Sequence, residues 1–258
     1  AGRVRTIAYG IGDAPAPDAD RELVALDVRA TATGTAFHLR SSWGEADVEV
    51  GTLGTFNVSN LLAVLGSLLA ADVPFDAALA EIGRLESVNG RMQRLGGRLQ
   101  NDEPLVVIDY AHTPDALEKT LDALRPIAAA RGGRLVCMFG CGGDRDATKR
   151  PLMGAIAERL ADETVVTSDN PRSEDPQRII DQVIAGMTAP DRARRIEDRA
   201  SAILQAVRGA AREDVVVLAG KGHEATQEIM GKKRAFSDQD HARLALGARA
   251  TQGKGGAE

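Results

Sequence analysis

Four polar segments of this sequence could do chemistry, and each directly follows a short apolar run. They are Asp109-Tyr-Ala-His112, Gly140-Cys-Gly-Gly-Asp-Arg-Asp146, Asp169-Asn-Pro-Arg172 and Gly220-Lys-Gly-His-Glu224. In an open parallel α/β sheet, ligands bind outside the carboxyl ends of the strands. If the apolar runs are such strands, the four segments project to the same edge of the sheet. We therefore expect a binding site at that edge.

The segment 169–172 has side chains that suit a zwitterion. The guanidinium of Arg172 can bind a carboxylate through two parallel hydrogen bonds, and Asp169 can bind an ammonium group. The Asn-Pro dipeptide alone also explains a turn that leads into a helix, so the pattern leaves both interpretations open. Arg145 is a second candidate for a carboxylate at a helix start, although an isolated arginine is more often a solvated surface residue.

The glycines of segment 140–146 indicate either a phosphate cradle or a tight turn between a strand and a helix. Their spacing is not that of the dinucleotide fingerprint. His112 and His223 have no third ligand at a suitable spacing, so we expect hydrogen-bonding roles for them and no metal site. No complete phosphate-binding loop of the Gly-x-x-x-x-Gly-Lys-Ser/Thr type occurs in the sequence.

Apolar runs alternate with helical segments from residue 105 onward. This alternation predicts an α/β domain with a doubly wound, mostly parallel sheet. Strands are expected at 105–109, 134–139, 163–167 and 214–219, and helices at 114–130, up to 160, from about 176, from about 198 and at 239–249. Residues 230–233 look like a hairpin tip, and residues 251–258 are expected to be disordered.

The earlier part of the chain has a different pattern. Short alternating runs predict strands at 3–9, 23–31, 35–40 and 46–50, and the following residues predict helices at 60–71 and 74–84. Glycines and polar residues at 96–104 place a domain boundary between Glu86 and Pro104.

Composition excludes several functional classes. A net charge of −5 argues against a nucleic-acid-binding protein. The most apolar stretch, 61–73, is shorter than the roughly 20 residues of a membrane span, so no membrane insertion is expected. Cys137 and Cys141 are expected to be reduced thiols. Without a signal-peptide pattern we expect a cytoplasmic protein, and without an initiator Met we expect a chain that begins partway through a longer one.

Together, the segments resemble the Mur ligase family. Phe56-Asn-Val-Ser-Asn60, Gly90-Arg-Met92 and Lys149-Arg-Pro151 join the four segments above in the family's order, and the similarity runs from about Ser41 to Ala248. The resemblance implies that residues 1–90 are the C-terminal part of a central ATP-binding domain. Residues 91–258 would be the family's C-terminal, Rossmann-like domain, which binds the amino acid. The phosphate loop and a carbamylated, magnesium-bridging lysine would lie upstream of Ala1.

The resemblance also implies an activity. It is to the members that add meso-diaminopimelate to UDP-MurNAc-L-Ala-D-Glu in peptidoglycan biosynthesis, with ATP and Mg²⁺ as cofactors. These ADP-forming amide ligases activate the D-Glu carboxylate as an acyl phosphate, which an amino group of diaminopimelate then attacks. The present chain would be a fragment that is inactive by itself. The sequence does not indicate an oligomeric state.

Residue roles follow from the resemblance position by position. The diaminopimelate pocket would be formed by Arg145, Asp169, Asn170, Pro171, Arg172, Gly220 and Glu224. The nucleotide would be bound by Asn57 and Asn60 near adenine, by the hinge pair Arg91 and Asp109 at ribose and phosphates, and by His112 beside them. The resemblance assigns no catalytic residue and no metal ligand within the chain.

Three details qualify these roles. A buried Arg172 would have no partner if lysine were the substrate, at a cost of roughly 3–5 kcal/mol, which favours diaminopimelate. Asn57 could also be the N-cap of the buried helix, and the two roles are compatible. Gln93 stands where relatives usually carry Glu, so a hinge contact could differ.

Two alternatives come from other functional classes. The first is a stand-alone amino-acid-binding module without catalysis, which the missing phosphate loop supports. The second is a Rossmann-type, NAD-dependent oxidoreductase, which only the glycine-rich segment supports. Folylpolyglutamate synthase shares the family architecture but gives no reason for the segment 169–172.

Overall fold

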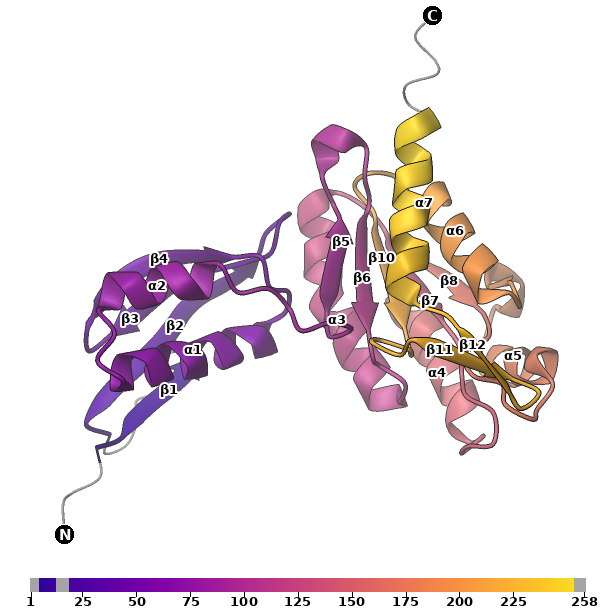
Figure 1. The fold of residues 1–258 in the computed structure, drawn as a ribbon, viewed down its shortest axis with the longest axis horizontal. Coiled ribbons are helices and arrows are strands. Elements are labelled where there is room, and N and C mark those ends of the chain that lie inside the picture. Colours follow the sequence, from indigo (N-terminus) through magenta and orange to yellow (C-terminus); the bar gives the residue numbers. More distant parts are fainter. Residues whose placement is uncertain (1–4, 13–18, 253–258) are drawn as a thin grey trace, which may run out of the picture. The chain divides into compact units, whose positions relative to one another are not determined.

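The structure is a computed structural model that describes residues 5–12 and 19–252, with side chains up to residue 249. The chain divides into two compact units, residues 1–86 and 87–258 (Figure 1). Each unit has its own sheet and its own apolar core. The assignment of the two units to an ATP-binding and an amino-acid-binding domain stays a prediction.

The first unit is a four-stranded sheet with two helices packed on it. Its elements are β1 (Ile7–Ile11), β2 (Arg21–Ala30), β3 (Thr35–Ser41), β4 (Gly44–Val50), α1 (Thr55–Ala70) and α2 (Phe75–Gly83). Strand β1 pairs with β2 in parallel, and the other neighbours are antiparallel. Leu23, Phe37 and Leu62 lie at the centre of the core. All four strands and both helices are confirmed, although residues 3 and 4 of the first expected strand lie outside the described residues.

The second unit is built on a six-stranded sheet in the order β5-β6-β10-β7-β8-β9. The strands are β5 (Gln93–Gly96), β6 (Leu105–Asp109), β7 (Leu135–Phe139), β8 (Glu163–Val166), β9 (Arg194–Arg195) and β10 (Val215–Ala219). Only β5 runs antiparallel to its neighbour, so the mostly parallel sheet is confirmed. The sequence did not predict β5 and β9, because both edge strands are short and neither is an apolar run.

Helices cover both faces of this sheet, as the doubly wound pattern predicts (Figure 1). They are α3 (Pro114–Arg131), α4 (Lys149–Leu160), α5 (Pro176–Ile184), α6 (Arg199–Gly209) and α7 (Asp238–Gln252). Apolar residues of α6 and α7 pack on one face of the sheet, and α3, α4 and α5 lie on the other. Helices α3 and α5 each begin with a capping side chain followed by proline, Thr113 and Asp175 being the caps.

The end of α7 differs from the expectation. The helix continues to Gln252, three residues beyond the expected Arg249. Disorder was therefore wrongly predicted for residues 251 and 252, because nothing before Gly253 breaks the helix. Residues 253–258 lie outside the described part of the chain.

A small hairpin follows β10. It consists of β11 (Thr226–Ile229) and β12 (Lys232–Ala235), which pair antiparallel around the turn at Met230 and Gly231. The hairpin tip predicted at residues 230–233 is therefore confirmed. Two 3₁₀ turns, at Leu99–Asn101 and Pro190–Arg192, complete the described elements.

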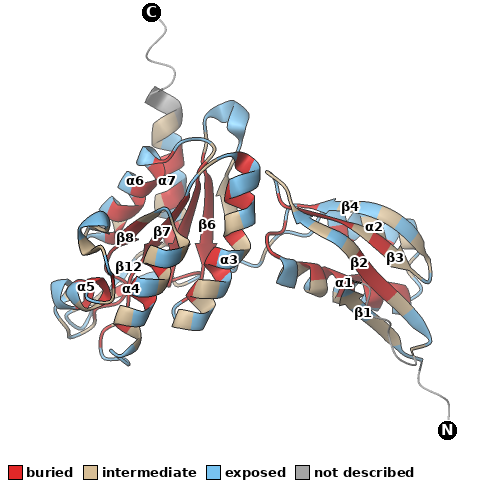
Figure 2. Cartoon of the chain, turned by 180° about the vertical axis from the view of Figure 1, so that it is seen from behind, coloured by how far each residue is buried: buried red, intermediate tan, exposed pale blue. Residues whose placement is uncertain are grey.

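The central strands of the second unit are buried and mostly apolar. Every residue of β6, β7 and β10 is buried, and none exposes more than a small fraction of its surface (Figure 2). Cys137 in β7 and Cys141 just after it are free thiols. Burial raises the pKa of both to about 12, so both are neutral at physiological pH.

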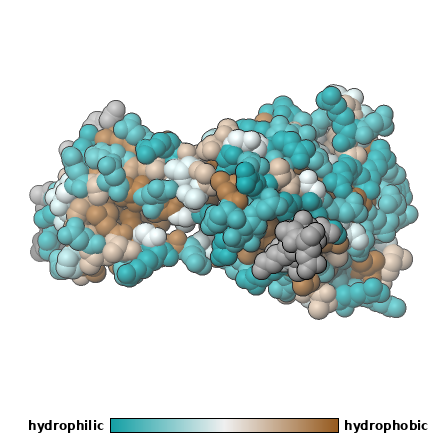
Figure 3. Space-filling view, turned by 90° about the horizontal axis from the view of Figure 1, so that it is seen from above, coloured by the Kyte–Doolittle hydropathy of each residue, from teal (hydrophilic) through white to brown (hydrophobic). Residues whose placement is uncertain are grey.

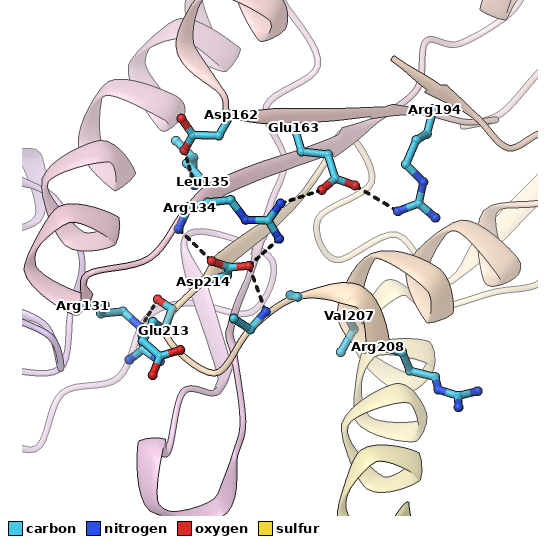
Figure 4. Close-up of polar contacts among 12 residues, drawn as sticks. Arg131, Arg134, Leu135, Asp162, Glu163, Arg194, Val207, Arg208, Glu213 and Asp214 are labelled. Atoms are coloured by element: carbon cyan, nitrogen blue, oxygen red, sulfur yellow. Dashed lines mark hydrogen bonds and ion pairs between the residues drawn. The ribbon is translucent and has the colours of Figure 1, made fainter. Parts of the chain in front are cut away.

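A network of charges ties together the amino ends of the parallel strands (Figure 4). Asp214, just before β10, accepts hydrogen bonds from the backbone N–H of Arg134 at 2.7 Å and of Ala211 at 2.9 Å, and it pairs with the Arg134 guanidinium at 2.9 Å. Asp162 accepts from the backbone N–H of Leu135 at 2.7 Å. These carboxylates fix the strands at the edge opposite to the four polar segments.

Hydrophobic surface is distributed unevenly. On the face shown in Figure 3, hydrophobic side chains gather over part of the first unit, while hydrophilic ones cover most of the second. Among the described helices, none has both the length and the apolar character that crossing a membrane requires.

Candidate functional site

A cavity of about 470 Å³ lies at the carboxyl edge of the six-stranded sheet. All four polar segments contribute to its wall. The lining residues are Tyr110, His112, Thr113, Gly140, Cys141, Gly142, Arg145, Asp146, Lys149, Asp169, Asn170, Arg172, Gly220 and Glu224. The structure thus brings the segments together at one edge, while the ligand of the cavity stays a prediction.

Six of the seven residues predicted for the amino-acid pocket line this cavity. The exception is Pro171, which is buried between its neighbours. Its carbonyl oxygen faces the backbone of the glycine-rich loop, where a Cβ on Gly143 would lie 1.9 Å away. Pro171 therefore shapes the loop and does not line the cavity.

The glycines of segment 140–146 are explained by the close packing of two loops. Gly143 donates a backbone hydrogen bond to the carbonyl of Asn170 at 2.9 Å. A Cβ on Gly140 would approach the carbonyl of Thr167 to 2.3 Å, and one on Gly143 would collide with Pro171. The loop after β7 can lie against the loop after β8 only without side chains at these positions. This packing explains the glycines, and no bound phosphate is needed to account for them.

The buried Arg150 holds the same two loops together. The Arg150 guanidinium binds both carboxylate oxygens of Glu174 at 2.8 Å and donates to the carbonyl of Gly142 at 3.0 Å. Glu174 in turn accepts from the backbone N–H of Asp144 at 2.6 Å. The hydrogen bonds from Arg150 lower the pKa of Glu174 to about 2, so this clamp stays ionised at all ordinary pH values.

Arg172 is held by the hairpin at a left-handed backbone conformation. Its φ is +52°, its N–H donates to the carbonyl of Glu228 at 3.0 Å, and its carbonyl accepts from the N–H of Met230. Its Nη1 donates to the carbonyl of Gly143 at 2.7 Å. The side chain is half-buried, so the premise of a buried Arg172 was wrong. The charge is partly solvated, and the cost of leaving it unpaired is smaller than for a buried ion.

Arg145 is an exposed residue of the loop after β7. The prediction that it stands at a helix start was wrong, because α4 begins only at Lys149. Its Nη1 makes a hydrogen bond to the carbonyl of Asp144 at 3.3 Å. The residue nevertheless lines the cavity, on the wall shared with Arg172. A ligand carboxylate could therefore meet two guanidinium groups.

Asp169 carries an unsatisfied oxygen into this site. The residue is buried, and its Oδ1 has no hydrogen-bond partner among the described residues. The nearest cation is Nζ of Lys221, at 3.6 Å from Oδ1. Burial raises the pKa of Asp169, against the opposing effect of Arg199 and Lys221. A buried carboxylate oxygen without a donor is a suitable acceptor for an ammonium group.

Asn170 and Glu224 form a hydrogen-bonded pair beside Asp169. Nδ2 of Asn170 donates to Oε2 of Glu224 at 2.8 Å, and Oδ1 of Asn170 accepts from the backbone N–H of Glu228 at 3.0 Å. Gly220 directly follows β10 and lies close to Asp169, with a φ of +112° that favours glycine. The amide of Asn170 is therefore fixed in one orientation.

Lys221, the buried cation of this site, was not predicted as a site residue. The sequence indicated it only as a member of the segment Gly220-Lys-Gly-His-Glu224. The structure buries it fully and directs its Nζ to the carbonyl of Thr226 at 2.7 Å, Oε2 of Glu224 at 3.2 Å and Oδ1 of Asn170 at 3.3 Å. A lysine between two glycines directly after a buried strand was the available signal.

A second missed feature supports the strand ends. Arg199 and Asp238 form a fully buried ion pair, with distances of 2.8 Å from Nε to Oδ1 and 2.6 Å from Nη2 to Oδ2. Arg199 also donates to the carbonyls of Ser168 at 3.3 Å and Ala219 at 3.1 Å. The pair thereby joins the starts of α6 and α7 to the ends of β8 and β10. Neither residue belongs to a polar segment, so no sequence pattern indicated this pair.

The residues predicted near adenine lie in the first unit, on α1. Nδ2 of Asn57 donates to the carbonyl of Leu53 at 2.7 Å, and Nδ2 of Asn60 donates to Oδ1 of Asn57 at 3.2 Å. The N-cap of α1 is Gly54, so the alternative of Asn57 as N-cap was wrong. Asn57 stands in the first turn and donates to a carbonyl, whereas a capping side chain accepts from a backbone N–H.

The other predicted nucleotide residues lie in the second unit. Asp109, at the end of β6, accepts from the backbone N–H of Met92 at 2.8 Å. Arg91 stacks on the ring of Tyr110, with its guanidinium carbon 4.7 Å from the ring centre. His112 lines the cavity, and its Nδ1 lies 2.7 Å from the carbonyl of Tyr110. Arg91 and Asp109 therefore flank the cavity wall without lining it.

No metal site is evident in the described part of the chain. Within residues 5–12 and 19–252, no group of three or more His, Cys, Asp or Glu side chains could hold a metal ion. The cavity-lining Asp146 is turned inward on its own loop, since Oδ1 accepts from the N–H and hydroxyl of Thr148 at 2.9 and 2.6 Å. We therefore assign no metal ligand to these residues.

The fold is an α/β domain with a polar cavity at the carboxyl edge of its sheet. Residues 90–222 match the family model described as Mur ligase, glutamate ligase domain. The chain belongs to the Mur ligase family, as the order of its motifs indicated.

Relatives with high sequence identity share one name. The UDP-N-acetylmuramoyl-L-alanyl-D-glutamate–2,6-diaminopimelate ligase of Ralstonia nicotianae is 60% identical over 95% of this chain and 48% of the relative. The ligase of the same name from Pseudomonas aeruginosa is 51% identical over 90% of this chain and 46% of the relative. The chain thus spans about half the length of the curated relatives it matches.

Solved structures agree with this assignment. A structure of a ligase with the same name superimposes with a TM-score of 0.71 at 40% identity, covering 91% of this chain and 46% of that one. A folylpolyglutamate synthase from Mycobacterium tuberculosis has a TM-score of 0.58 at 24% identity, covering 78% of this chain and 46% of that one, and shares the fold.

Proposed function

We propose that this chain is the amino-acid-binding part of an ADP-forming ligase that joins meso-diaminopimelate to UDP-MurNAc-L-Ala-D-Glu. The observation that supports this proposal most directly is the arrangement of charged groups in the cavity. Guanidinium groups of Arg145 and Arg172 lie on one wall, and the carboxylates of Asp169 and Glu224 lie near the end of β10. Diaminopimelate carries carboxylates and ammonium groups that complement both.

The free hydrogen-bonding groups match this assignment. Nη1 of Arg172 is used by backbone carbonyls, but among the described residues no hydrogen bond involves its Nη2. Oδ1 of Asp169 has no donor either. A carboxylate of the substrate at Arg172 and an ammonium group at Asp169 would satisfy both groups. L-Lysine has no second carboxylate to occupy the arginine.

This chain's contribution to the reaction is to bind and orient the acceptor. One ammonium group is held at Asp169, and the other must lose a proton and point its nitrogen at the D-glutamyl carbonyl. A C–N bond then forms as the bond to phosphate breaks. ATP with Mg²⁺ supplies the activation of the carboxylate. Asn57, Asn60, Arg91, Asp109 and His112 remain our candidates for nucleotide contacts, and we place the reaction in the cytoplasm.

A stand-alone amino-acid-binding module is the second candidate, because the same cavity would serve it. The two functions differ in the release of phosphate. We find no support for the oxidoreductase alternative, since the glycines of segment 140–146 are explained by loop packing.

The test is a phosphate-release assay on the complete protein that contains this sequence. ATP, Mg²⁺ and UDP-MurNAc-L-Ala-D-Glu are supplied, with meso-diaminopimelate and L-lysine compared as acceptors. We expect turnover with diaminopimelate alone, and none from the 258-residue chain by itself. Equal turnover with lysine would refute the pocket assignment. Binding of diaminopimelate without turnover would favour the binding module.

A further inference from the structure

Lys221 is buried behind the cavity and does not line it. Its side chain is fully buried, and Nζ is surrounded by oxygen atoms from three segments. These are the carbonyl of Thr226, the amide oxygen of Asn170 and the carboxylate of Glu224. A buried ammonium group with these partners is expensive to desolvate, and a methionine would fill the same space. Packing alone therefore does not explain why a lysine stands at this position.

The charges around Asp169 give that reason. Arg199 also faces Asp169, but Asp238 holds it in a bidentate ion pair, so its charge is already compensated. Lys221 is then the remaining cation opposite the carboxylates of Asp169 and Glu224. Two carboxylates and one ammonium group leave one negative charge, which the ammonium group of a ligand would balance. The neighbouring Cys141 thiol is neutral because burial raises its pKa to about 12.

Geometry adds to this electrostatic argument. Oε2 of Glu224 accepts hydrogen bonds from Nζ of Lys221 and from Nδ2 of Asn170, while among the described residues no donor reaches Oε1. Oδ1 of Asn170 accepts hydrogen bonds from Nζ of Lys221 and from the backbone N–H of Glu228. The lysine thus fixes which oxygen of Glu224 and which group of Asn170 remain available to a ligand.

We infer that Lys221 is a positioning residue for the substrate ammonium group, which aligns Asn170 and Glu224 and faces the Asp169 carboxyl beside them. This inference rests on the proposed function. Lys221 acts through these three side chains and does not itself contact the substrate.

Lys221→Met in the complete protein tests the inference, with Lys119→Met on the exposed side of α3 as a matched control. Because hydrogen bonds to charged groups are lost, we expect the KM for diaminopimelate to rise about tenfold or more. The KM for ATP and for UDP-MurNAc-L-Ala-D-Glu should stay within about twofold. The control, whose lysine makes a solvent-exposed pair with Asp115, should change none of them.

The pH profile separates positioning from a structural role. Diaminopimelate binds the carboxylate form of Asp169, so kcat/KM falls as the pH falls through its pKa. Removing the cation raises that pKa, and the acid limb of Lys221→Met should move to higher pH. Lys221→Arg keeps the charge and should restore the limb while the KM stays above that of the wild type. Should Lys221→Met not fold, Lys221→Gln removes the charge but keeps a donor, and it should show the same shift.

Two outcomes would overturn the inference. One is an unmoved acid limb in folded Lys221→Met or Lys221→Gln, and the other is an equal rise of the KM for all three substrates. Calorimetric titration with meso-diaminopimelate gives the same comparison if the wild type proves to bind without turnover. In that case the ligase proposal fails and the role of Lys221 is still measured. A wild type that does not bind diaminopimelate refutes both proposals.

Discussion

The two edges of the six-stranded sheet both place buried carboxylates near cations, but they satisfy the oxygen atoms differently. At the amino edge, both oxygens of Asp214 are occupied by backbone N–H groups and by Arg134 (Figure 4). At the carboxyl edge, Oδ1 of Asp169 has no donor within the described structure. The amino edge is complete without a ligand, and the carboxyl edge is not.

The pKa values of these carboxyls differ in the same sense. Burial alone would raise the pKa of Asp214, but the hydrogen bonds from Arg134 and Ala211 lower it below its usual range. Burial raises the pKa of Asp169, and the cations nearby do not fully offset it. Ionised Asp214 therefore stabilises the fold, whereas ionised Asp169 destabilises it. Such destabilised charges are typical of binding sites, because the ligand supplies the missing partner.

The largest expected effect is on stability, from Asp214→Ala at the amino edge. The backbone N–H groups of Arg134 and Ala211 and the Arg134 guanidinium would lose a charged acceptor, at a total cost of about 3 kcal/mol. The Tm of the second unit should fall by roughly 6–12 °C, and the KM for diaminopimelate should not change. Thermal and denaturant unfolding of the variant and the wild type measure this.

The pH dependence of stability gives a second test of Asp214→Ala. A lowered pKa means that Asp214 stabilises the fold above its unfolded value of about 4 and that this contribution is lost as the pH falls through the folded value. The two proteins should therefore converge in stability at low pH. Asp115→Ala, which removes an exposed carboxylate from α3, serves as the control. A raised KM in Asp214→Ala would erase the distinction between the edges.

The next effect is on binding, from Arg172→Ala at the carboxyl edge. Loss of a charge-assisted pair with the substrate corresponds to about 1.5–3 kcal/mol, so the KM for diaminopimelate should rise roughly ten- to 150-fold. The Tm should change little, since the side chain is half-buried and bonds only to carbonyls within the chain. Arg243→Ala on the exposed side of α7 is the matched control. An unchanged KM would remove Arg172 from the pocket.

Asp169→Asn should separate function from stability in a single variant. We expect the KM for diaminopimelate to rise about tenfold, with a Tm at pH 7 no lower than that of the wild type. The amide removes a charge whose raised pKa costs stability above that pKa. Below the unfolded pKa of about 4 the carboxyl is neutral in both states, so any gain in Tm should vanish there. A Tm clearly below that of the wild type at pH 7 would show that Asp169 stabilises the fold.

The sequence predicted the elements well where local pattern decides them. The apolar runs at β6, β7, β8 and β10 were located almost to the residue, because a buried parallel strand is a continuous apolar run. Strands β5 and β9 were missed, since tertiary pairing at the sheet edges forms them and their own residues do not. Helix α1 begins five residues before the expected Asn60, at Thr55, because the polar residues of its first turn hid its start.

The candidate site was predictable only in part. The rule for the carboxyl edge of parallel sheets gathered the four segments correctly, since it needs only the order of strands and loops. Its supporting residues were not predictable, because each depends on a partner far away in the sequence. Lys221 meets Asn170 across 51 residues, and Arg199 meets Asp238 across 39. Arg150 was seen as part of a motif, but its partner Glu174 was not.

The smallest effect on kinetics is expected from Gln93→Glu. This variant allows two residues of the carboxyl edge, Gln93 and Asp169, to be compared. Gln93 pairs with Ile108 near the end of β6, and its Oε1 accepts from the backbone N–H of Gly90 at 3.0 Å. A glutamate at this position keeps that acceptor. We therefore expect kcat and every KM to stay within about twofold, because the carboxylate keeps the hydrogen bond to Gly90 and its added charge is partly solvated. Steady-state kinetics with ATP and diaminopimelate as the varied substrates measure this.

This result would show that position at the carboxyl edge is not sufficient for a role in binding. Gln93 lies at that edge with its acceptor already satisfied within the chain, in contrast to Asp169. Gln93→Ala is the companion variant, because it removes the acceptor and leaves the N–H of Gly90 without it. If Gln93→Glu alone changed the KM for ATP more than about fivefold, the charge at this position would matter. The turn from Gly90 to Gln93 would then belong to the functional part of the edge, beside Arg91.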